Sequence, residues 1–351
     1  MNLLACDLGG TKVLLGIYEK KNNEPPKLLK KQKYKSSDWD SFYDILDNFL
    51  NNQLVDSNSL VACFAIAGAI KNNSAQITNL SWNISSAFLK RKYNFLKVEL
   101  INDFAVQIYG IPTLNETQFK IIHDNKSNLS TKEKDFHTIV GVGTGLGISR
   151  GIISNKVITV LPSEGGHVEF PSRSKEEWEF KEWLRRELKI KRVSAERVLN
   201  GEALYYIAKW KLEQYKMHNH SLNKILEQAS QNSESKRNIP SVICEAANLN
   251  DELINQVVKF WLNAYASYLG DVALHELCYG GLWISGGTAP KHLQYFLSDT
   301  FLKHFFNKGR LNNIVKTIPL RIIIDEQFGM YSAACRANML LQKQIKPNDY
   351  S

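Results

Sequence analysis

Two glycine-rich turns carry the groups in this sequence that could bind a polyphosphate. The first turn, DLGGTK over Asp7–Lys12, places a carboxylate, two adjacent glycines and a threonine at one chain reversal. Unhindered backbone N–H groups and a hydroxyl at such a turn can donate hydrogen bonds to phosphate oxygens. The second turn, GTGLG over Gly143–Gly147, repeats this content around Thr144. Each turn alone is explained more simply by a plain β-hairpin, but the two together favour a pair of contacts with one polyphosphate.

A divalent cation and the base of a nucleotide also have candidate contacts at glycine turns. Asp7 can hold Mg²⁺ through water, because this ion takes oxygen ligands and keeps much of its hydration shell. A third glycine pair, Gly286-Gly287, follows the apolar run Leu282–Ser285 and could let an adenine or a ribose lie flat against the backbone. A loop before a helix that starts near Pro290 explains this pair equally well.

One carboxylate could act as the base in a phosphoryl transfer to an alcohol. That reaction needs a base directed at the attacking hydroxyl, with a metal ion and donors over the phosphates. Asp103 follows the apolar run Val98–Ile101 and stands beside Asn102, at a strand end where residues of a cleft tend to lie. From sequence alone, capping of a helix that begins at Phe104 is the simpler role for Asp103.

Three further side chains could hold a ligand with several hydroxyl groups. Glu164 and His167 lie in SEGGHVEF, Ser163–Phe170, where a glycine turn can direct an acceptor and a donor toward one ring. Zinc binding by His167 is a weak alternative, because no cysteine or second histidine lies near it in the sequence. Glu196 stands in the first turn of a helix capped by Ser194, where the helix dipole alone would favour a carboxylate.

The elements that must position these groups alternate between strands and helices. Both phosphate turns join two apolar runs, so the unit of strand, glycine turn and strand recurs after about 135 residues, which indicates duplication of a domain. A cleft between two related domains follows from such a duplication. The expected strands lie within residues 2–19 and at Lys27–Lys35, Leu60–Ala67, Val98–Ile101, Thr138–Gly143, Ile148–Ser154, Leu282–Ser285 and Leu320–Ile324.

Apolar side chains at helical spacing predict the remaining elements. The polar stretch His123–Asp135 is expected as a surface loop, and Met217–Asn238 as a short amphipathic piece followed by a polar loop. The expected helices begin behind Ser37 or Asp38, lie within Lys175–Trp210, run from a cap at Asn250 or Asp251 through Leu277, and extend from about Met330 to Gln342.

The bulk composition narrows the class of protein. The chain has 351 residues, of which 44% are hydrophobic and 23% charged, enough for two packed domains of a globular enzyme. The lysines are scattered, so the net charge of +9 indicates a solvated surface rather than a nucleic-acid site, as the alternating run Lys27–Lys35 illustrates. Five separated cysteines with no CxxC pair argue against disulfides or structural zinc.

These cysteines favour a reducing cytosol. The sequence shows neither a signal peptide nor an apolar run of about 18 residues. We therefore expect a cytoplasmic protein that binds small molecules and has no nucleic-acid or membrane partner.

Taken in order, the segments DLGGTK, INDF, GTGLG, SEGGH and SAERVLNG resemble the bacterial glucokinase family, within the superfamily of actin-like ATPases and sugar kinases. The similarity extends to AIAGAI and TNLSWNI within Ala65–Ile84, WISGG at Trp283–Gly287 and FGMYSAA at Phe328–Ala334, so it covers nearly the whole chain. Related kinases that share DLGGTK and EGGH commonly carry a cysteine-rich zinc loop soon after that histidine, whereas no cysteine lies between Cys63 and Cys244 here.

This resemblance implies a role for each candidate residue. In that family the aspartate that matches Asp103 is the general base, and the positions that match Asn102, Glu164, His167 and Glu196 hold sugar hydroxyls. Asn79, within TNLSWNI, is expected to contact the substrate as well. The residues implied to bind ATP are Asp7, Gly9, Gly10, Thr11, Lys12, Gly143, Thr144, Gly145, Gly286 and Gly287, with Mg²⁺ held by Asp7 through water.

The sequence thus predicts an α/β protein with the two-domain actin-like ATPase (ribonuclease H-like) fold, with mixed sheets and an interdomain cleft. Residues 1–112, completed by about 325–345, form the expected small domain, and residues 113–324 the large one. The expected reaction moves the γ-phosphoryl group of ATP to the 6-hydroxyl of glucose, giving glucose 6-phosphate and ADP. A kinase for another hexose and a non-catalytic sugar-sensing regulator remain the alternatives, and a homodimer is suggested by family analogy alone.

Overall fold

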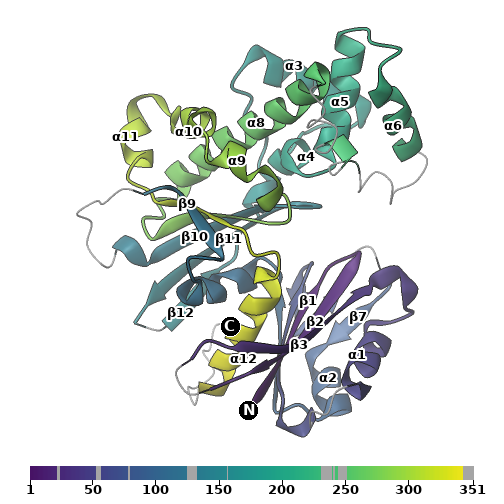
Figure 1. The fold of residues 1–351 in the computed structure, drawn as a ribbon, viewed down its shortest axis with the longest axis vertical. Helices are drawn as coiled ribbons and strands as arrows, with labels where there is room; N and C mark the ends of the chain where they lie inside the picture. Colours follow the sequence, from purple (N-terminus) through teal and green to yellow (C-terminus); the bar gives the residue numbers. More distant parts are fainter. Residues whose placement is uncertain are drawn as a thin grey trace. The chain divides into compact units, whose positions relative to one another are not determined.

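The computed structural model describes residues 1–21, 24–52, 57–77, 80–124, 133–155, 157–230, 239, 242–243 and 251–342. Its contacts divide the chain into two compact units (Figure 1). The first unit contains Met1–Gln118, Asn155–Leu161 and Asp325–Ser351, and the second contains Phe119–Ser154 and Pro162–Ile324. The first unit therefore extends past residue 112 to Gln118 and also takes in Asn155–Leu161.

A mixed, five-stranded sheet forms the centre of the first unit, with the strand order β3-β2-β1-β4-β8. β1 runs antiparallel to β2 and parallel to β4, and β4 runs parallel to β8. The lysine-rich strand β3 lies at the edge, where Tyr34 is its one buried residue, which confirms the expected solvent face. The strands span Asn2–Leu8 (β1), Lys12–Glu19 (β2), Lys27–Lys35 (β3), Val61–Ile66 (β4) and Lys97–Asn102 (β8), and the helices Phe42–Asn51 (α1), Ser86–Tyr93 (α2), the 3-10 helix Ala105–Thr113 (η3) and Phe328–Gln342 (α12).

Helices cover both faces of this sheet, because its central strands are apolar on both sides. Leu4, Cys6 and Leu8 of β1 pack in one cluster with buried residues of α1 and α2. Leu3 and Ala5, which point to the opposite face, pack with residues of η3 and α12. Figure 1 shows α1 and α2 on one side of the sheet and α12 on the other. The C-terminal helix thus completes the N-terminal unit.

Helix α1 begins later than the sequence predicts. The Oγ of Ser41 accepts a hydrogen bond from the N–H of Asp44 at 3.2 Å and caps the helix. The expected caps, Ser37 and Asp38, instead lie in a 3-10 turn over Ser36–Asp38. Trp39 follows that turn with an extended backbone, so the 3-10 turn cannot continue into the helix.

Five strands of a related sheet lie in the second unit, in the order β11-β10-β13-β14-β9. β10 runs antiparallel to β11 and parallel to β13, and β13 runs parallel to β14. This pattern of directions matches β2-β1-β4-β8 in the first unit, as expected for a duplicated domain. The strands span Phe119–His123 (β9), Phe136–Val142 (β10), Leu146–Ser154 (β11), Gly281–Ser285 (β13) and Leu320–Ile323 (β14), while Val157–Leu161 (β12) belongs to the first unit.

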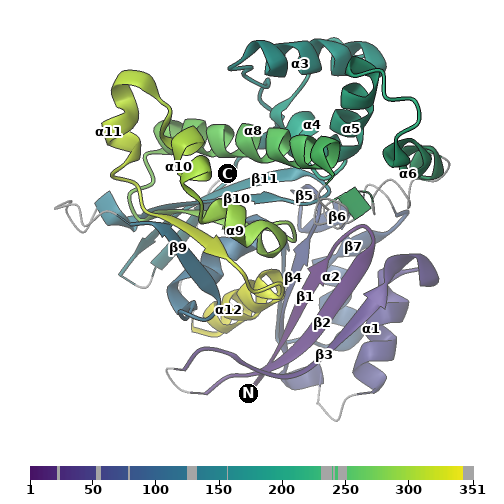
Figure 2. The same cartoon turned by 45° about the horizontal axis from the view of Figure 1, so that its top comes forward.

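A long helix, α8, packs with the sheet and the smaller helices of the second unit (Figure 2). Its cap is Asp251, whose Oδ1 accepts from the N–H of Ile254 at 3.0 Å. The helices span Lys175–Glu187 (α3), Ala195–Leu199 (α4), Ala203–Gln214 (α5), Ser221–Ser230 (α6), Glu252–Glu276 (α8), Leu293–Phe296 (α9), Asp299–Phe306 (α10) and Asn312–Val315 (α11).

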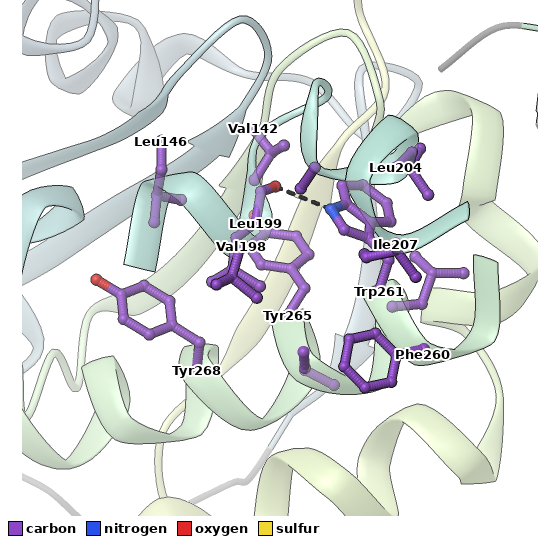
Figure 3. Packing of buried hydrophobic residues seen from close by; sticks show 14 of the residues in the cluster. Val142, Leu146, Val198, Leu199, Leu204, Ile207, Phe260, Trp261, Tyr265 and Tyr268 are labelled. Atoms are coloured by element: carbon purple, nitrogen blue, oxygen red, sulfur yellow. Dashed lines mark hydrogen bonds between the residues drawn. The ribbon is translucent and has the colours of Figure 1, made fainter. Parts of the chain in front are cut away.

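The core of the second unit anchors its glycine turn. Val142 and Leu146, which flank that turn, are buried with Trp261 and Tyr265 of α8 (Figure 3). The indole N–H of Trp261 donates to the carbonyl oxygen of Leu199 at 3.1 Å and so ties α8 to α4. The residues on both sides of the turn are therefore anchored in the core. The position of the turn depends on packing against helices that are distant in the sequence.

The two expected loops are described only in part. In the first, His123 ends β9 and Glu133–Asp135 forms a 3-10 turn, while residues 125–132 lie outside the described residues. In the second, the amphipathic piece is α6, and residues 231–238 lie outside the described residues. None of the helices in the described part of the chain combines the length and hydropathy needed to cross a membrane.

Candidate active site

Parallel pairing brings two candidate carboxylates to one edge of the first unit's sheet. Leu8 pairs with Ile66, and Ile66 pairs with Asn102, in two adjacent parallel ladders. The N–H of Asp103 then donates to the carbonyl oxygen of Ile66 at 3.0 Å. Asp7 and Asp103 therefore lie at the carboxyl ends of β1 and β8, where the pairing partner β4 separates them.

Asn102 performs most of the helix capping that the sequence leaves open for Asp103. The Oδ1 of Asn102 accepts hydrogen bonds from the N–H groups of Phe104 at 3.0 Å and Ala105 at 3.1 Å. The Oδ1 of Asp103 shares the N–H of Phe104, also at 3.0 Å. Because Asn102 accepts two N–H groups at the start of η3 and Asp103 only shares one of them, capping does not require Asp103.

The carboxyl group of Asp103 is tuned to titrate near neutral pH. Burial raises its pKa, and the nearby negative charge of Asp7 raises it further. Hydrogen bonds to the carboxylate, among them that from the N–H of Phe104, oppose these effects, and the resulting pKa is about 7. A pKa near the working pH is the property that a general base requires.

The first glycine turn closes beside Asp7. The N–H of Gly9 donates to the carbonyl oxygen of Lys12 at 3.0 Å, and the N–H of Ser36 donates to that of Thr11 at 3.1 Å. Burial raises the pKa of Asp7, and the ammonium group of Lys12 opposes this shift. The turn thus combines a glycine-rich backbone with a carboxylate and a lysine, a set that suits a phosphate accompanied by a cation.

Helix α12 approaches Asp7 at a glycine. A Cβ placed on Gly329 would lie 3.0 Å from the Oδ2 of Asp7 and 3.4 Å from its Cγ. No group of three or more His, Cys, Asp or Glu side chains within the described ranges is arranged to hold a metal ion. A Mg²⁺ ion held by Asp7 through water would take its other ligands from water and phosphate.

The second and third glycine turns lie against each other in the second unit. The N–H of Gly143 donates to the carbonyl oxygen of Gly145 at 2.9 Å, which closes the turn. Gly286 has φ of +97°, and a Cβ on it would lie 2.5 Å from the carbonyl oxygen of Val142. The hydroxyl of Thr288 donates to that same oxygen at 2.9 Å. Gly286 is thus required both by its backbone conformation and by this close approach.

The structure brings together the three residues of the second unit that were predicted to bind a sugar. The Nε2 of His167 lies 3.8 Å from the Oε2 of Glu164, and its Nδ1 lies 3.9 Å from the Oε1 of Glu196. The side chains of Glu164 and His167 are 89% and 56% exposed, whereas that of Glu196 is 26% exposed. Two acceptors therefore flank one imidazole at a solvent-accessible surface, an arrangement that suits a polyhydroxyl ligand.

Glu196 contacts the second glycine turn as well. Its Oε2 accepts a hydrogen bond from the N–H of Leu146 at 3.1 Å. Ser194 occupies the N-cap position of α4, but its side chain makes no capping hydrogen bond, contrary to the expectation from sequence. The helix dipole is thus not the only reason for a carboxylate at Glu196.

Two residues that support the sugar-binding turn could not be found from the sequence. The hydroxyl of Tyr268 on α8 donates to the carbonyl oxygen of Gly165 at 2.8 Å, and Arg192 donates to that of His167 at 2.7 Å. Neither residue belongs to a motif, because each acts through tertiary contact alone. Asn79, predicted to contact the substrate, lies outside the described residues.

Comparisons with known proteins identify the family of this chain. The profile of the family described as Glucokinase matches residues 4–340. A glucokinase from a Nostoc species is 34% identical, over 96% of this chain and 99% of its own. Among solved structures, a glucokinase from an Antarctic psychrotroph has a TM-score of 0.78 at 24% identity, covering 96% of this chain and 99% of that one.

A more distant structure shares the fold. It is a ROK family glucokinase from Streptomyces griseus in complex with glucose and AMPPNP, with a TM-score of 0.62 at 16% identity, covering 97% of this chain and 100% of that one. These neighbours show that both units follow the actin-like ATPase fold, as predicted. Because the family profile matches nearly its whole length, the chain belongs to the glucokinase family.

Proposed function

We propose that this chain transfers the γ-phosphoryl group of ATP to the 6-hydroxyl of glucose. The observation that carries the proposal is Asp103, a carboxyl group with a pKa of about 7 at the same sheet edge as Asp7 and the first glycine turn. The chain belongs to a family of sugar phosphotransferases. The glucose and AMPPNP bound to the Streptomyces neighbour are consistent with the same pair of ligands here.

Asp103 serves as the general base in this proposal. Its carboxylate accepts the proton of the sugar 6-hydroxyl as that oxygen forms a bond to the γ-phosphorus, and the bond from phosphorus to the bridging oxygen of ADP breaks. The glycine turns at Gly9–Thr11 and Gly143–Gly145 donate N–H groups to the phosphate oxygens. Mg²⁺, when bound through water to Asp7, neutralises negative charge on the phosphates.

In this proposal, both hydrogen-bond acceptors and hydrogen-bond donors hold the sugar. Glu164 and Glu196 accept hydrogen bonds from hydroxyl groups, while His167 and the carboxamide of Asn102 can donate to them. Binding of the sugar also displaces water from the phosphoryl group, which favours transfer to glucose over hydrolysis. The expected cleft between domains and the contact of Asn79 with the substrate stay predictions.

A coupled assay of ADP release with a panel of hexoses tests the proposal. Glucose should give the highest kcat/KM among glucose, mannose, fructose and amino sugars. A higher kcat/KM for another hexose would assign the chain to that sugar instead. Clear glucose binding without glucose-dependent ADP release would identify a sugar-sensing regulator.

The Gly329→Ala substitution should weaken Mg²⁺ binding in the presence of ATP. The added methyl group would lie 3.0 Å from the Oδ2 of Asp7, so the carboxylate must shift to make room. We expect the Kd of Mg²⁺, measured by calorimetry with saturating ATP, to rise by roughly 3- to 10-fold, or about 1 kcal/mol. In an Asp7→Ala background the second substitution should have no further effect, because the displaced oxygen atoms are absent. If Gly329→Ala weakened Mg²⁺ binding equally in the Asp7→Ala background, the effect would not act through Asp7.

We further propose that the protein acts in the cytoplasm as a glycolytic enzyme. By family analogy we also propose a homodimer. In support of a reducing compartment, Cys6, Cys63, Cys278 and Cys335 are all buried free thiols. Sedimentation of the purified chain over a range of concentrations gives its oligomeric state directly. A single species at monomer mass would exclude the dimer.

A further inference from the structure

The carboxylate of Glu196 lies between two candidate sites of the second unit. Its Oε2 accepts the N–H of Leu146, the first residue of β11, which directly follows Gly145. Its Oε1 lies 3.9 Å from the Nδ1 of His167, too far for a direct hydrogen bond. One oxygen is therefore committed to the phosphate turn, and the other remains available to a ligand at the sugar-binding residues.

The segment that carries Glu196 holds the turn at both of its ends. Besides the contact at Leu146, the N–H of Gly201 donates to the carbonyl oxygen of Gly143 at 2.9 Å. A Cβ on Gly145 would lie 2.8 Å from the Oε2 of Glu196, so the carboxylate packs directly against the turn. A movement of Glu196 would therefore change the contacts that hold the turn.

The charge of Glu196 acts on the same turn. A carboxylate beside donors that are meant for phosphate oxygens repels a bound polyphosphate, and this side chain is only 26% exposed, so water screens it incompletely. Hydroxyl groups that donate to Oε1 would spread and partly compensate that charge. They would also fix the carboxylate in the position from which it holds Leu146.

We infer that Glu196 couples the two substrates: glucose bound at Glu196 positions the Gly143–Gly145 turn and so strengthens ATP binding. This inference rests on the proposed function, since it takes glucose and ATP as the ligands. By thermodynamic linkage ATP then strengthens glucose binding by the same factor. Glu196 is in this sense a positioning residue for the nucleotide as well as a ligand of the sugar.

The test measures the Kd of AMPPNP with Mg²⁺ by calorimetry, with and without saturating glucose. In the unmodified chain we expect glucose to lower this Kd by about 5-fold or more, the lower end of typical coupling between sites. In Glu196→Ala the ratio of the two Kd values should fall to about 1. Should alanine impair folding, Glu196→Gln removes the charge at nearly constant volume and should lower the ratio in the same direction.

Glu164→Ala provides a matched control. Glu164 lies on the other side of His167 at a similar distance, and within the described residues its exposed side chain forms no hydrogen bond or ion pair with the turn. Its loss should weaken glucose binding yet leave the coupling ratio within about twofold of the unmodified chain once glucose is saturating. Equal loss of coupling in both variants would overturn the inference, as would unchanged coupling in Glu196→Ala.

A second measurement does not depend on ligand affinity. Without ligands, the amide hydrogen of Leu146 should exchange faster in Glu196→Ala than in the unmodified chain, and at an unchanged rate in Glu164→Ala. Unchanged exchange in Glu196→Ala would also contradict the inference. Failure of the proposed function would look different, because the unmodified chain would then bind no glucose or release no ADP.

Discussion

Replacing Asp103 with asparagine should lower kcat by about 10²- to 10⁴-fold, the usual range for loss of a general base, while glucose still binds. Asparagine keeps the volume of the side chain and can still accept the hydrogen bond that Phe104 donates to Asp103. It cannot accept the proton of the attacking hydroxyl. The measurements are steady-state turnover and glucose binding by calorimetry.

The pH dependence of the same reaction gives an independent check. Because burial and the charge of Asp7 raise the pKa of Asp103 to about 7, the unmodified enzyme should gain kcat/KM as pH rises through about 7. The residual activity of Asp103→Asn should not show this rise of kcat/KM with pH.

The raised pKa also affects stability. In the folded chain Asp103 binds its proton up to a pH of about 7, whereas an unfolded aspartate releases it near 3.8, so the folding stability falls as pH rises between these values. Asp103→Asn should therefore have a higher Tm than the unmodified chain above pH 7, and no such advantage near pH 3.

Asp47→Asn is a suitable control for Asp103→Asn. Asp47 belongs to the same unit and forms an ion pair with Lys92 at 2.6 Å, and its side chain is 39% exposed. Its substitution should leave turnover and the pH profile unchanged. Near-normal turnover in Asp103→Asn, or a pH profile that Asp103→Asn does not alter, would remove Asp103 from the mechanism.

Replacing Gly166 with alanine should destabilise the protein by about 1–3 kcal/mol, the usual cost of overpacking, and weaken glucose binding about tenfold. A Cβ at this position would lie 2.0 Å from the carbonyl oxygen of Leu146 and 3.1 Å from its carbonyl carbon. Backbone atoms cannot rotate away as a flexible side chain can, so the turn between Glu164 and His167 must move. The distances that hold those two side chains near Glu196 would change with it.

Thermal unfolding and glucose calorimetry measure the two effects of Gly166→Ala. Gly143→Ala serves as the control for stability, because a Cβ there would meet no atom within 4 Å. Its Tm should stay close to that of the unmodified chain, whatever it does to phosphate binding. An unaltered Tm and glucose affinity in Gly166→Ala would contradict the close approach of the turn to β11.

Local spacing in the sequence was sufficient to predict the central strands and the glycine turns, but not the strands Phe119–His123 and Val157–Leu161. The run Val61–Ile66 is apolar throughout and forms a central strand, because helices cover both of its faces. The recurrence of strand, glycine turn and strand predicted two related sheets, and the two observed strand orders agree with it. The motifs also predicted the family, which the match over residues 4–340 confirms.

Contacts between distant segments decided which residues cap the helices. The sequence offered Asp103 as the cap of η3, yet Asn102 makes most of those hydrogen bonds, because the exact geometry at a strand end depends on the neighbouring strand. The sequence likewise placed the cap of α1 at Ser37 or Asp38, and the structure places it at Ser41.

The functional pairings depend on the same long-range packing. Glu196 meets Leu146 across a separation of 50 residues, and Gly329 meets Asp7 from the opposite end of the chain. The sequence by itself determined which residue types stand at which turns, since short-range periodicity and turn chemistry are local properties. Only the tertiary structure decided which of these turns touch and how strongly burial raises the pKa of Asp103, because both depend on atoms that are far apart in the chain.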